Sequence, residues 1–340
     1  MSICLDPSPE QQLILASVNR LLDAQFPAAR LRSSAAGGDM PAQSVAALAG
    51  IGALGLGLSE EQGGAGFGLL EDVLLFVALG RHLITPSALA TVMAARLATE
   101  CGHKELAQSL LSGRQSVCLG QPLGAWQNDE QPLPVHVFDA AGADDVLLWG
   151  ESGLGLASLA DLTLEPRTPM DRSVSLHHTK VRFRSLKLWR SAGDTRLWLQ
   201  AQLLLGAQLL GMAQACTDMA VAYAKLRSQF GRPIGSFQAV KHRCADMAVR
   251  SEVLRAQLHM ATLAEVRQAS DADFQIAACH WLAADHALAN ARSNVQIHGG
   301  IGFAAECDAH LYVLRAHLYD QIGGKVDGRR LLSHRWADPL

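Results

Sequence analysis

The pattern that most constrains the fold is a long run of regularly spaced small or apolar residues in the last third of the chain. Its members are separated by alternating steps of four and three: Val240, Cys244, Met247, Ser251, Leu254, Leu258 and Ala261. This spacing places them on one face of a long α-helix, and such a face suits the near-parallel packing of helices. Because a second face of this kind follows between residues 277 and 295, the sequence predicts a C-terminal bundle of about four helices.

The hydrophobic pattern changes twice along the chain. Residues 9–112 show helical spacing, whereas residues 116–188 contain short apolar or alternating runs separated by Asp, Gly and Pro. These runs lie at 135–138, 146–149, 162–164 and 179–184. The first pattern is typical of helices and the second of short strands. The sequence therefore predicts an α+β fold that is mainly α, with an N-terminal helical domain over 1–113, a small antiparallel β domain over 114–188 and a C-terminal helical bundle over 189–340.

The composition favours a folded protein with a small ligand or a protein partner. Hydrophobic residues make up 49% of the 340 residues, which is enough to build a sizeable core. Lys and Arg are scattered and the formal net charge is -3, which argues against nucleic acid or a membrane as the partner. The chain starts without a basic stretch followed by an apolar run, so no signal peptide is expected and the protein is predicted to be cytoplasmic.

Cysteines and histidines are not spaced as metal ligands. The seven cysteines, at positions 4, 101, 118, 216, 244, 279 and 307, form no CxxC pair, which is typical of reduced thiols in the cytoplasm. His242, His298, His310 and His317 form no recognisable ligand motif with a carboxylate, so no metal site is expected. Arg315 and Arg335 are expected on the surface, in ordinary ion pairs.

Two glycine-containing stretches carry the candidate binding residues. In the first, Arg227 lies near the end of a helix that a Gly/Pro turn at 231–233 terminates. Its guanidinium donates two parallel hydrogen bonds, which suits a pyrophosphate. In the second, Gln296 precedes glycines at 299, 300 and 302, which leave the backbone bare for a flat ring while the amide pairs with a purine edge. Taken alone, each stretch is more typical of an ordinary helix end or a connection between helices than of a binding site.

In this order, after a helical and then a β segment, these stretches resemble the acyl-CoA dehydrogenase family of flavoproteins. The resemblance covers almost the whole chain: residues 51–66 resemble the N-terminal helical signature, 227–238 the flavin-pyrophosphate turn and 296–302 the adenine turn. It implies FAD at a subunit interface, an acyl-CoA substrate, and electron-transfer flavoprotein or a similar acceptor. It also implies which residues reach the FAD seated mainly on the neighbouring subunit: Arg227, Phe230, Gln296, Gly299 and Gly300.

The family's catalytic base is missing from this sequence. Members remove the α-proton of the acyl thioester with one glutamate, and the alignment places Gly323 at that position. Some relatives carry the carboxylate at the start of the first bundle helix, but residues 198–202 contain no acid. The nearest acids in the sequence, Asp320 and Glu306, are weak candidates because a residue three positions away on a helix points in another direction.

The β segment lacks two further family motifs. A Thr-Glu-Pro-x-x-Gly-Ser-Asp loop that contacts the flavin ring and substrate is expected after residues 116–120, where this chain has residues 121–126 instead. A Trp-x-x-Ser spacing occurs only at Trp149 and Ser152, which is where the following strand is expected. The residues that contact the flavin ring are therefore missing, whereas those that help a neighbour hold the adenosine are present.

Three functions are consistent with this asymmetry. The favoured hypothesis is a base-lacking subunit that completes the FAD site of a paralogous catalytic chain in a heterotetramer, as in bacterial acyl-CoA dehydrogenases of steroid breakdown. The first alternative is a homo-oligomeric dehydrogenase with a displaced base, Glu306 or Asp320. The second is a non-catalytic scaffold without FAD. Fatty acid or steroid catabolism is the expected context.

Overall fold

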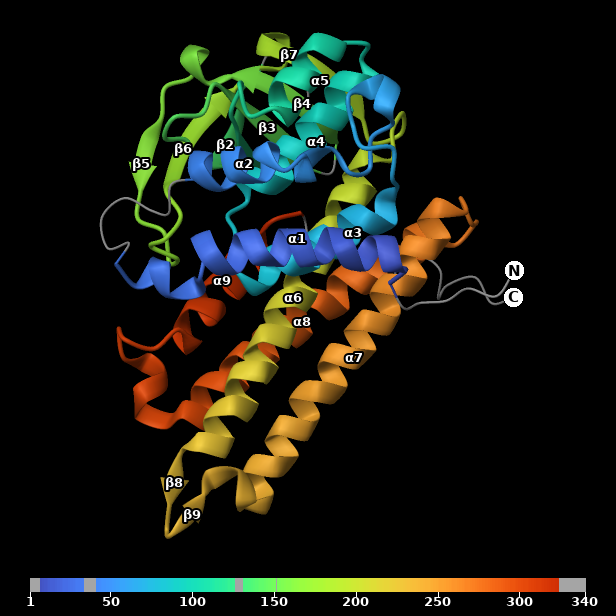
Figure 1. Ribbon diagram of the computed structural model, residues 1–340. Helices are drawn as coiled ribbons and strands as arrows, with labels where there is room; N and C mark the ends of the chain where they lie inside the picture. The colour runs from blue at the N-terminus through green and yellow to red at the C-terminus, as the bar shows by residue number, and fades with distance from the viewer. Residues whose placement is uncertain (1–6, 34–40, 126–130, 151, 324–340) are drawn as a thin grey trace, which may run out of the picture.

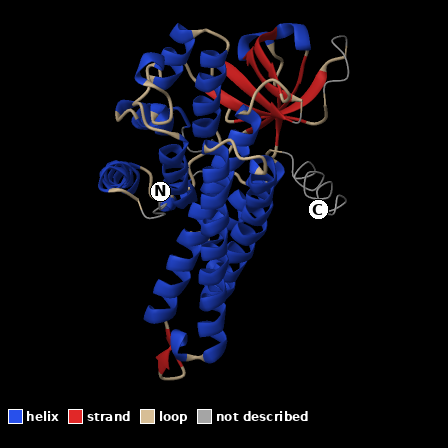
Figure 2. Cartoon of the chain, turned by 90° about the vertical axis from the view of Figure 1, so that its right-hand side faces the viewer, coloured by secondary structure: helices blue, strands red, loops and turns tan. Residues whose placement is uncertain are grey.

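The structure is a computed structural model that describes residues 7–33, 41–125, 131–150 and 152–323. In Figure 1 the sheet and most of the N-terminal helices lie at the top, and the long C-terminal helices extend below them to a hairpin at the tip. Figure 2 shows the sheet beside the N-terminal helices, both at one end of the bundle. The mainly helical α+β fold expected from the sequence is confirmed.

The N-terminal part is helical as expected. Its helices are α1 (Pro9–Gln25), α2 (Pro41–Gly50), α3 (Leu69–Arg81), α4 (Ser87–Glu100) and α5 (Lys104–Leu111). Ser8 caps α1 by accepting a hydrogen bond from the backbone N–H of Gln11, whose side chain accepts one in return from the Ser8 N–H, a reciprocal arrangement that satisfies two free N–H groups of the first turn. Between α2 and α3 the chain makes short 3₁₀ turns at Ala53–Gly55 and Glu60–Gln62.

The middle part is a sheet of seven strands in the order β5-β6-β2-β1-β3-β4-β7. The strands are β1 (Val117–Pro122), β2 (Leu133–Phe138), β3 (Asp145–Gly150), β4 (Gly153–Ser158), β5 (Glu165–Arg167), β6 (Leu176–Val181) and β7 (Leu186–Ser191). Three details correct the sequence expectation. β1 and β3 are parallel rather than antiparallel, because the chain crosses after β2 to the far side of β1. Residues 162–164 precede β5 and do not form a strand. β7 extends past the expected boundary at residue 188, since Ser191 pairs with Gly153.

The two faces of the sheet bury different clusters. Leu119, Leu147 and Leu156 belong to the large core shared with the helices. Residues of the opposite face, such as Val135 and Val146, form a smaller cluster with residues of the loops. Because consecutive side chains of a strand point to opposite faces, both faces of the central strands are buried, and the sheet depends on the helices for one of its two covers.

The C-terminal part contains the expected bundle of α6 (Leu197–Leu226), α7 (Gln238–Val266), α8 (Ala272–His298) and α9 (Ala309–Gln321). The predicted apolar face of α7 is buried from Met247 onward, with Leu254, Leu258 and Ala261 in the core. Two glycines let α3 approach α6 closely, since a Cβ on Gly80 would lie 1.9 Å from the Gln208 carbonyl oxygen and one on Gly211 would lie 1.9 Å from that of Val77.

Arg315 is not on the surface, contrary to the expectation from sequence. Its side chain is fully buried in α9 and donates to Asp171 at 2.6 Å, to Ser173 at 2.9 Å and to the carbonyl oxygens of Leu83 and Ile84. Burial alone would raise the pKa of Asp171, but Arg315 and Ser173 hold it below its ordinary value. One guanidinium thus joins the bundle, the sheet segment and the N-terminal helices. Arg335 lies outside the described residues.

A second carboxylate nearby gives a pH-dependent prediction. Asp139 is buried, and this burial raises its pKa to about 7, against the opposing influence of Arg315. The folded state therefore holds the proton more tightly than the unfolded state, so this group stabilises the fold at low pH and that stability is lost as the pH rises from about 4 to about 7. Asp139→Asn cannot ionise, and asparagine tolerates the positive φ of 59° at this position. We expect the variant to equal the wild type near pH 4 and to exceed its unfolding free energy by about 2–4 kcal/mol at pH 8 in urea titrations. Identical pH profiles for the two proteins would contradict this.

Three further observations concern the described residues only. No helix among them is long and apolar enough to span a membrane. They contain no group of three or more His, Cys, Asp and Glu side chains that could hold a metal ion. The cysteines they include are free thiols, of which Cys118, Cys216 and Cys279 are buried.

Candidate functional site

The candidate binding residues of the first stretch lie on the hairpin at the tip of the bundle. α6 ends at Leu226, and Arg227 leaves the helix with an extended backbone and exposed side chain. The hairpin pairs β8 (Ser228–Gln229) with β9 (Arg232–Pro233). Phe230 occupies its turn with a positive φ of 52° and is 92% exposed. A non-glycine residue with positive φ and an exposed ring is costly for an isolated chain, which points to a role outside it.

The second stretch lies at the same end of the bundle. α8 ends at His298, Gly299 turns the chain with a φ of 66°, and a 3₁₀ turn follows over Gly299–Phe303. Gln296 is exposed, and a Cβ on Gly299 or Gly300 would meet no atom within 4 Å. The backbone of this turn is therefore exposed at Gly299 and Gly300, whereas Gly302 is buried.

An aromatic contact holds the two stretches together. The rings of Tyr223 and His298 stack with centroids 4.2 Å apart and planes 23° apart. Tyr223 lies one turn before Arg227, and its carbonyl oxygen accepts a hydrogen bond from the backbone N–H of Arg227 at 2.8 Å. His298 immediately precedes Gly299. Nδ1 of His298 donates to the Asn294 carbonyl oxygen at 2.9 Å, since a carbonyl can only accept. Sequence reasoning missed this pair because its partners are 75 residues apart.

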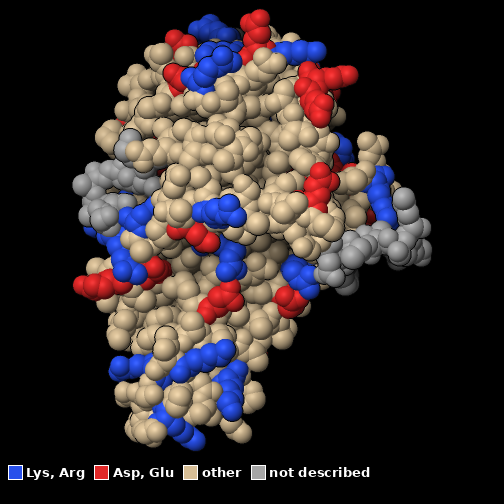
Figure 3. Space-filling model, in the orientation of Figure 1, with Lys and Arg blue, Asp and Glu red and all other residues tan. Residues whose placement is uncertain are grey.

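The surface of this end is cationic and apolar. Its exposed cations are Lys225, Arg227, Arg232, Lys241 and Arg243. In Figure 3 blue surface gathers at the lower tip, and no red surface is seen beside it on that face. Large exposed apolar side chains surround the same turns: Leu226, Phe230, Ile301 and Phe303. Cations attract phosphates, and an exposed apolar patch marks a docking surface.

Gly323, which the alignment with the family places at the position of the base, is surrounded by other groups. Gly323 follows α9 with a φ of 84°, and an added Cβ would lie 2.7 Å from the indole ring of Trp149. The backbone N–H of Gly323 donates to Oε1 of Gln121 at 3.0 Å. The carbonyl oxygen of Gly323 accepts a hydrogen bond from Nε2 of Gln202 at 3.0 Å. Trp149 is fully buried. The position therefore lacks the carboxylate and also lacks the room for one.

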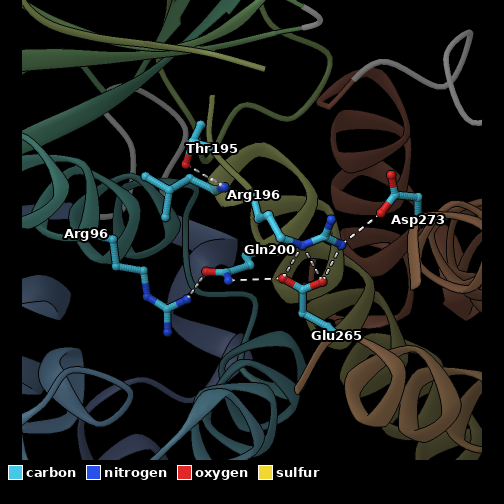
Figure 4. A network of polar contacts seen from close by, with 7 residues as sticks. Arg96, Thr195, Arg196, Gln200, Glu265 and Asp273 are labelled. Carbon is cyan, nitrogen blue, oxygen red and sulfur yellow. Dashed lines mark hydrogen bonds and ion pairs between the residues drawn. The ribbon is translucent and has the colours of Figure 1, made fainter. Parts of the chain in front are cut away.

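The second family position for the base, at the start of α6, is part of a polar network (Figure 4). Gln200 accepts a hydrogen bond from Arg96 of α4 at 2.6 Å and donates to Glu265 of α7 at 3.2 Å. Arg196 donates to both oxygens of Glu265 and, at 2.8 Å, to Asp273 of α8. Sequence reasoning missed this buried carboxylate beside residues 198–202. Its oxygens are occupied by Arg196 and Gln200, so Glu265 acts as an ion-pair partner between helices.

The network continues into the N-terminal helices. Arg96 also donates to the buried carboxylate of Asp72, which accepts the N–H of Gly57 at 3.1 Å. Burial raises the pKa of Asp72 to about 6, while Arg96 opposes the shift. A Cβ on Gly57 would overlap the Asp72 carboxylate at 1.9 Å, which explains a glycine at this point of the N-terminal signature. A groove of about 240 Å³ lies beside these groups, next to Arg96 and Gln200.

The two weak candidates for a displaced base lie in different places. Asp320 is half-buried on the last turn of α9, three residues before Gly323. Glu306 is exposed before the start of α9. Because α9 has 13 residues, its two ends are about 20 Å apart. Glu306 therefore lies near the adenine turn, far from Gly323, and only Asp320 lies close to the position of the base.

The layer between sheet and bundle is filled by the protein itself. Every residue of α4 from Ser87 to Ala98 is buried. This helix packs against α6 and against β1, β3, β4 and β7. A helix that is apolar or buried all round leaves no free face. The chain thus has an open cationic tip and a closed centre.

Two family models match the chain. The model for the N-terminal domain of acyl-CoA dehydrogenase matches residues 8–116, and the model for the C-terminal domain matches residues 199–337. Acyl-CoA dehydrogenase IpdE2 of Mycobacterium tuberculosis is 36% identical over 292 residues, which cover 85% of each chain. Acyl-CoA dehydrogenase FadE34 of the same organism is 35% identical over 303 residues. That match covers 86% of this chain but 40% of FadE34, so this chain spans less than half of that relative.

Solved structures share the fold. The ChsE4-ChsE5 complex from Mycobacterium tuberculosis contains a chain that matches with a TM-score of 0.83 and 24% identity, over 99% of this chain and 100% of that one. The Tcur3481-Tcur3483 steroid ACAD variant matches with a TM-score of 0.80 and 24% identity, over 97% and 99%. Butyryl-CoA dehydrogenase from Megasphaera elsdenii matches with a TM-score of 0.80 at 18% identity, over 99% and 100%.

Proposed function

Because this chain belongs to the acyl-CoA dehydrogenase family, we propose that it is the subunit without a catalytic base in a heteromeric, FAD-dependent acyl-CoA dehydrogenase. In this proposal it completes the FAD site of a paralogous catalytic chain in the cytoplasm. The observation that carries the proposal is the contrast between the two ends of the expected site. The tip with Arg227 and Gln296 is open and cationic, whereas the place of the base at Gly323 is occupied by Trp149.

The residues present fit one half of FAD. At the tip, Arg227 would hold the pyrophosphate, Gln296 would pair with the adenine edge, and Gly299 and Gly300 would let the ring approach the backbone. Phe230 would reach across the interface from the projecting hairpin. The flavin ring does not fit this chain in the same way, since the ring-contacting loop is absent from its sequence and α4 is buried from Ser87 to Ala98. The ring is therefore assigned to the partner.

The division of labour follows from the chemistry of the reaction. Dehydrogenation of an acyl-CoA needs a carboxylate to remove the α-proton, and bound FAD supplies the acceptor for the β-hydrogen as hydride. The partner provides that carboxylate, and electron-transfer flavoprotein or a similar acceptor takes the electrons. The present chain contributes binding and orientation of the cofactor's nucleotide end.

The comparisons support a heteromeric assembly. Two of the structures with this fold are complexes named for two different proteins, and one of these is called a steroid ACAD. FadE34 matches over 40% of its own length, which leaves room in that relative for a second unit of this size. A bulky, steroid-derived acyl-CoA is therefore the proposed substrate class.

Co-expression tests the proposal. We expect this chain to purify without flavin when it is expressed alone. Together with a paralogous chain that carries the glutamate, we expect a complex with one FAD per heterodimer that oxidises acyl-CoA. Full activity with one FAD per chain in the purified homo-oligomer would instead favour a displaced base, for which Asp320→Asn should abolish turnover. A stable complex without flavin absorbance would favour the scaffold.

A further inference from the structure

A row of contacts joins α8 to α6 and runs to the tip of the bundle. Its members on α8 are Asn290, Asn294 and His298, which are four residues apart and therefore lie on one face of the helix. Asn290 donates to the carbonyl oxygen of Ala213 on α6 at 3.3 Å. Asn294 is fully buried and donates to the sulfur of Met219 on α6 at 3.9 Å. These contacts fix the register of α8 against α6 up to the last turn of each helix.

The last contact of the row is the stack of Tyr223 on His298, and it lies next to both candidate binding stretches. Arg227 follows Tyr223 by one helical turn, and Gly299 follows His298 directly. A slip of α8 by one residue along its axis would move Gly299 by about 1.5 Å relative to Arg227. Such a shift is large compared with the range of distances over which a hydrogen bond forms. The stack therefore controls the spacing of the two stretches.

The chain itself holds the ring of His298 in place. Its Nδ1 donates to the carbonyl oxygen of Asn294 at 2.9 Å, and both stacked rings are half-buried. The turn after α8 folds back on the same side chain, since a Cβ on Gly302 would lie 3.1 Å from the Cβ of His298 and 2.7 Å from the carbonyl oxygen of Val295. The geometry of the pair is therefore set by the protein before any ligand binds.

A ligand that contacts both stretches at once depends on this spacing. In the function proposed above, one FAD places its pyrophosphate at Arg227 and its adenine at Gly299. When two contact groups are held at a fixed separation, the second contact forms without a further cost of ordering. Resting on that proposed function, we propose that Tyr223 and His298 are positioning residues for FAD. They act by fixing the distance between the two contacts, and their role requires no contact of their own with the cofactor.

The affinity of the co-expressed complex for FAD, measured by fluorescence titration after removal of its flavin, tests this role. We expect Tyr223→Leu to weaken FAD binding about tenfold, which is the size of effect that one aromatic pair supplies. Tyr223→Phe keeps the stacked ring and should stay within about twofold of the wild type. His298→Leu should match Tyr223→Leu, and the double variant should bind no more weakly than either single variant, because both remove the same contact.

Phe183→Leu is the matched control. It removes another aromatic contact, with Trp189 at a centroid distance of 5.3 Å, in the sheet segment, and should leave FAD affinity within about twofold. Thermal melts check that every variant folds. A Tyr223→Leu complex that melts earlier but binds FAD like the wild type would reduce the stack to a purely structural role and overturn the inference. A Tyr223→Phe complex that binds as weakly as Tyr223→Leu would overturn it too, since the hydroxyl rather than the stack would then matter.

Arg227→Ala, measured in parallel, separates the inference from the proposed function. If Arg227→Ala weakens FAD binding and Tyr223→Leu does not, the positioning role is wrong while the proposed function stands. If neither change affects FAD binding, the tip does not hold the cofactor, and the proposed function is wrong together with the positioning role.

Discussion

Gly323→Glu is expected to lower the free energy of unfolding by about 4–6 kcal/mol and to produce no dehydrogenase activity. The Cβ of the new side chain would lie 2.7 Å from the Trp149 ring, and the backbone φ of 84° is one that residues with a side chain rarely adopt. Both effects arise from the Cβ alone and are independent of the carboxylate. The carboxylate itself would then enter a region where Trp149 and Gln202 are already buried, which costs further free energy.

Urea unfolding and acyl-CoA turnover in the co-expressed complex provide the measurements. Gly50→Glu is the matched control, because a Cβ at Gly50 meets no atom within 4 Å and its φ is not positive; it should change the unfolding free energy by less than about 0.5 kcal/mol. In a double-mutant cycle, Trp149→Ala should reduce the cost of Gly323→Glu by about 1–3 kcal/mol, since it removes the overlap. A Gly323→Glu variant that is as stable as the wild type and turns over substrate would show that this position still has room for a base.

The features of this fold that the sequence predicts are those that depend on the spacing of residues close together in the chain. The apolar face between Val240 and Ala261 lies on α7, and α8 ends directly before the glycines at 299 and 300. The preceding helix, α6, ends at Leu226, before the Gly/Pro turn at 231–233 that was expected to terminate it, because residues 228–233 form a hairpin. Each of these features depends on residues within one or two helical turns of each other. The sheet was harder to predict, because β1 and β4 are buried on both faces and show no alternation of apolar and polar residues.

The contacts that complete the candidate site join residues that are distant in the sequence. Arg315 looked like a surface residue because buried arginines are rare, and its partner Asp171 lies 144 positions earlier. Trp149 looked like a misplaced motif, whereas the fold brings it to Gly323. Glu265 lies beside the start of α6 although it belongs to the end of α7. The sequence alone shows that residue 323 has no carboxylate, but it does not show that Trp149, Gln121 and Gln202 surround this residue.

Arg227→Ala is expected to weaken FAD binding by the co-expressed complex about 100-fold, which corresponds to the loss of one charge-assisted, two-pronged contact with the pyrophosphate. Flavin absorbance after dialysis and fluorescence titration of the apo-complex measure the effect. Arg227→Lys keeps the charge but loses the forked geometry. Its affinity for FAD should therefore lie between that of the wild type and that of Arg227→Ala.

The control for this experiment lies at the other end of the same bundle. Arg267 is exposed where α7 ends, so Arg267→Ala removes an equal charge far from the tip and should leave FAD affinity within about twofold. Since Arg227 is exposed and caps α6 through its backbone, its truncation should not alter the mass of the complex. If Arg227→Ala retains FAD as tightly as Arg267→Ala does, the tip does not hold the pyrophosphate, and the open cationic end must be assigned to protein contacts alone.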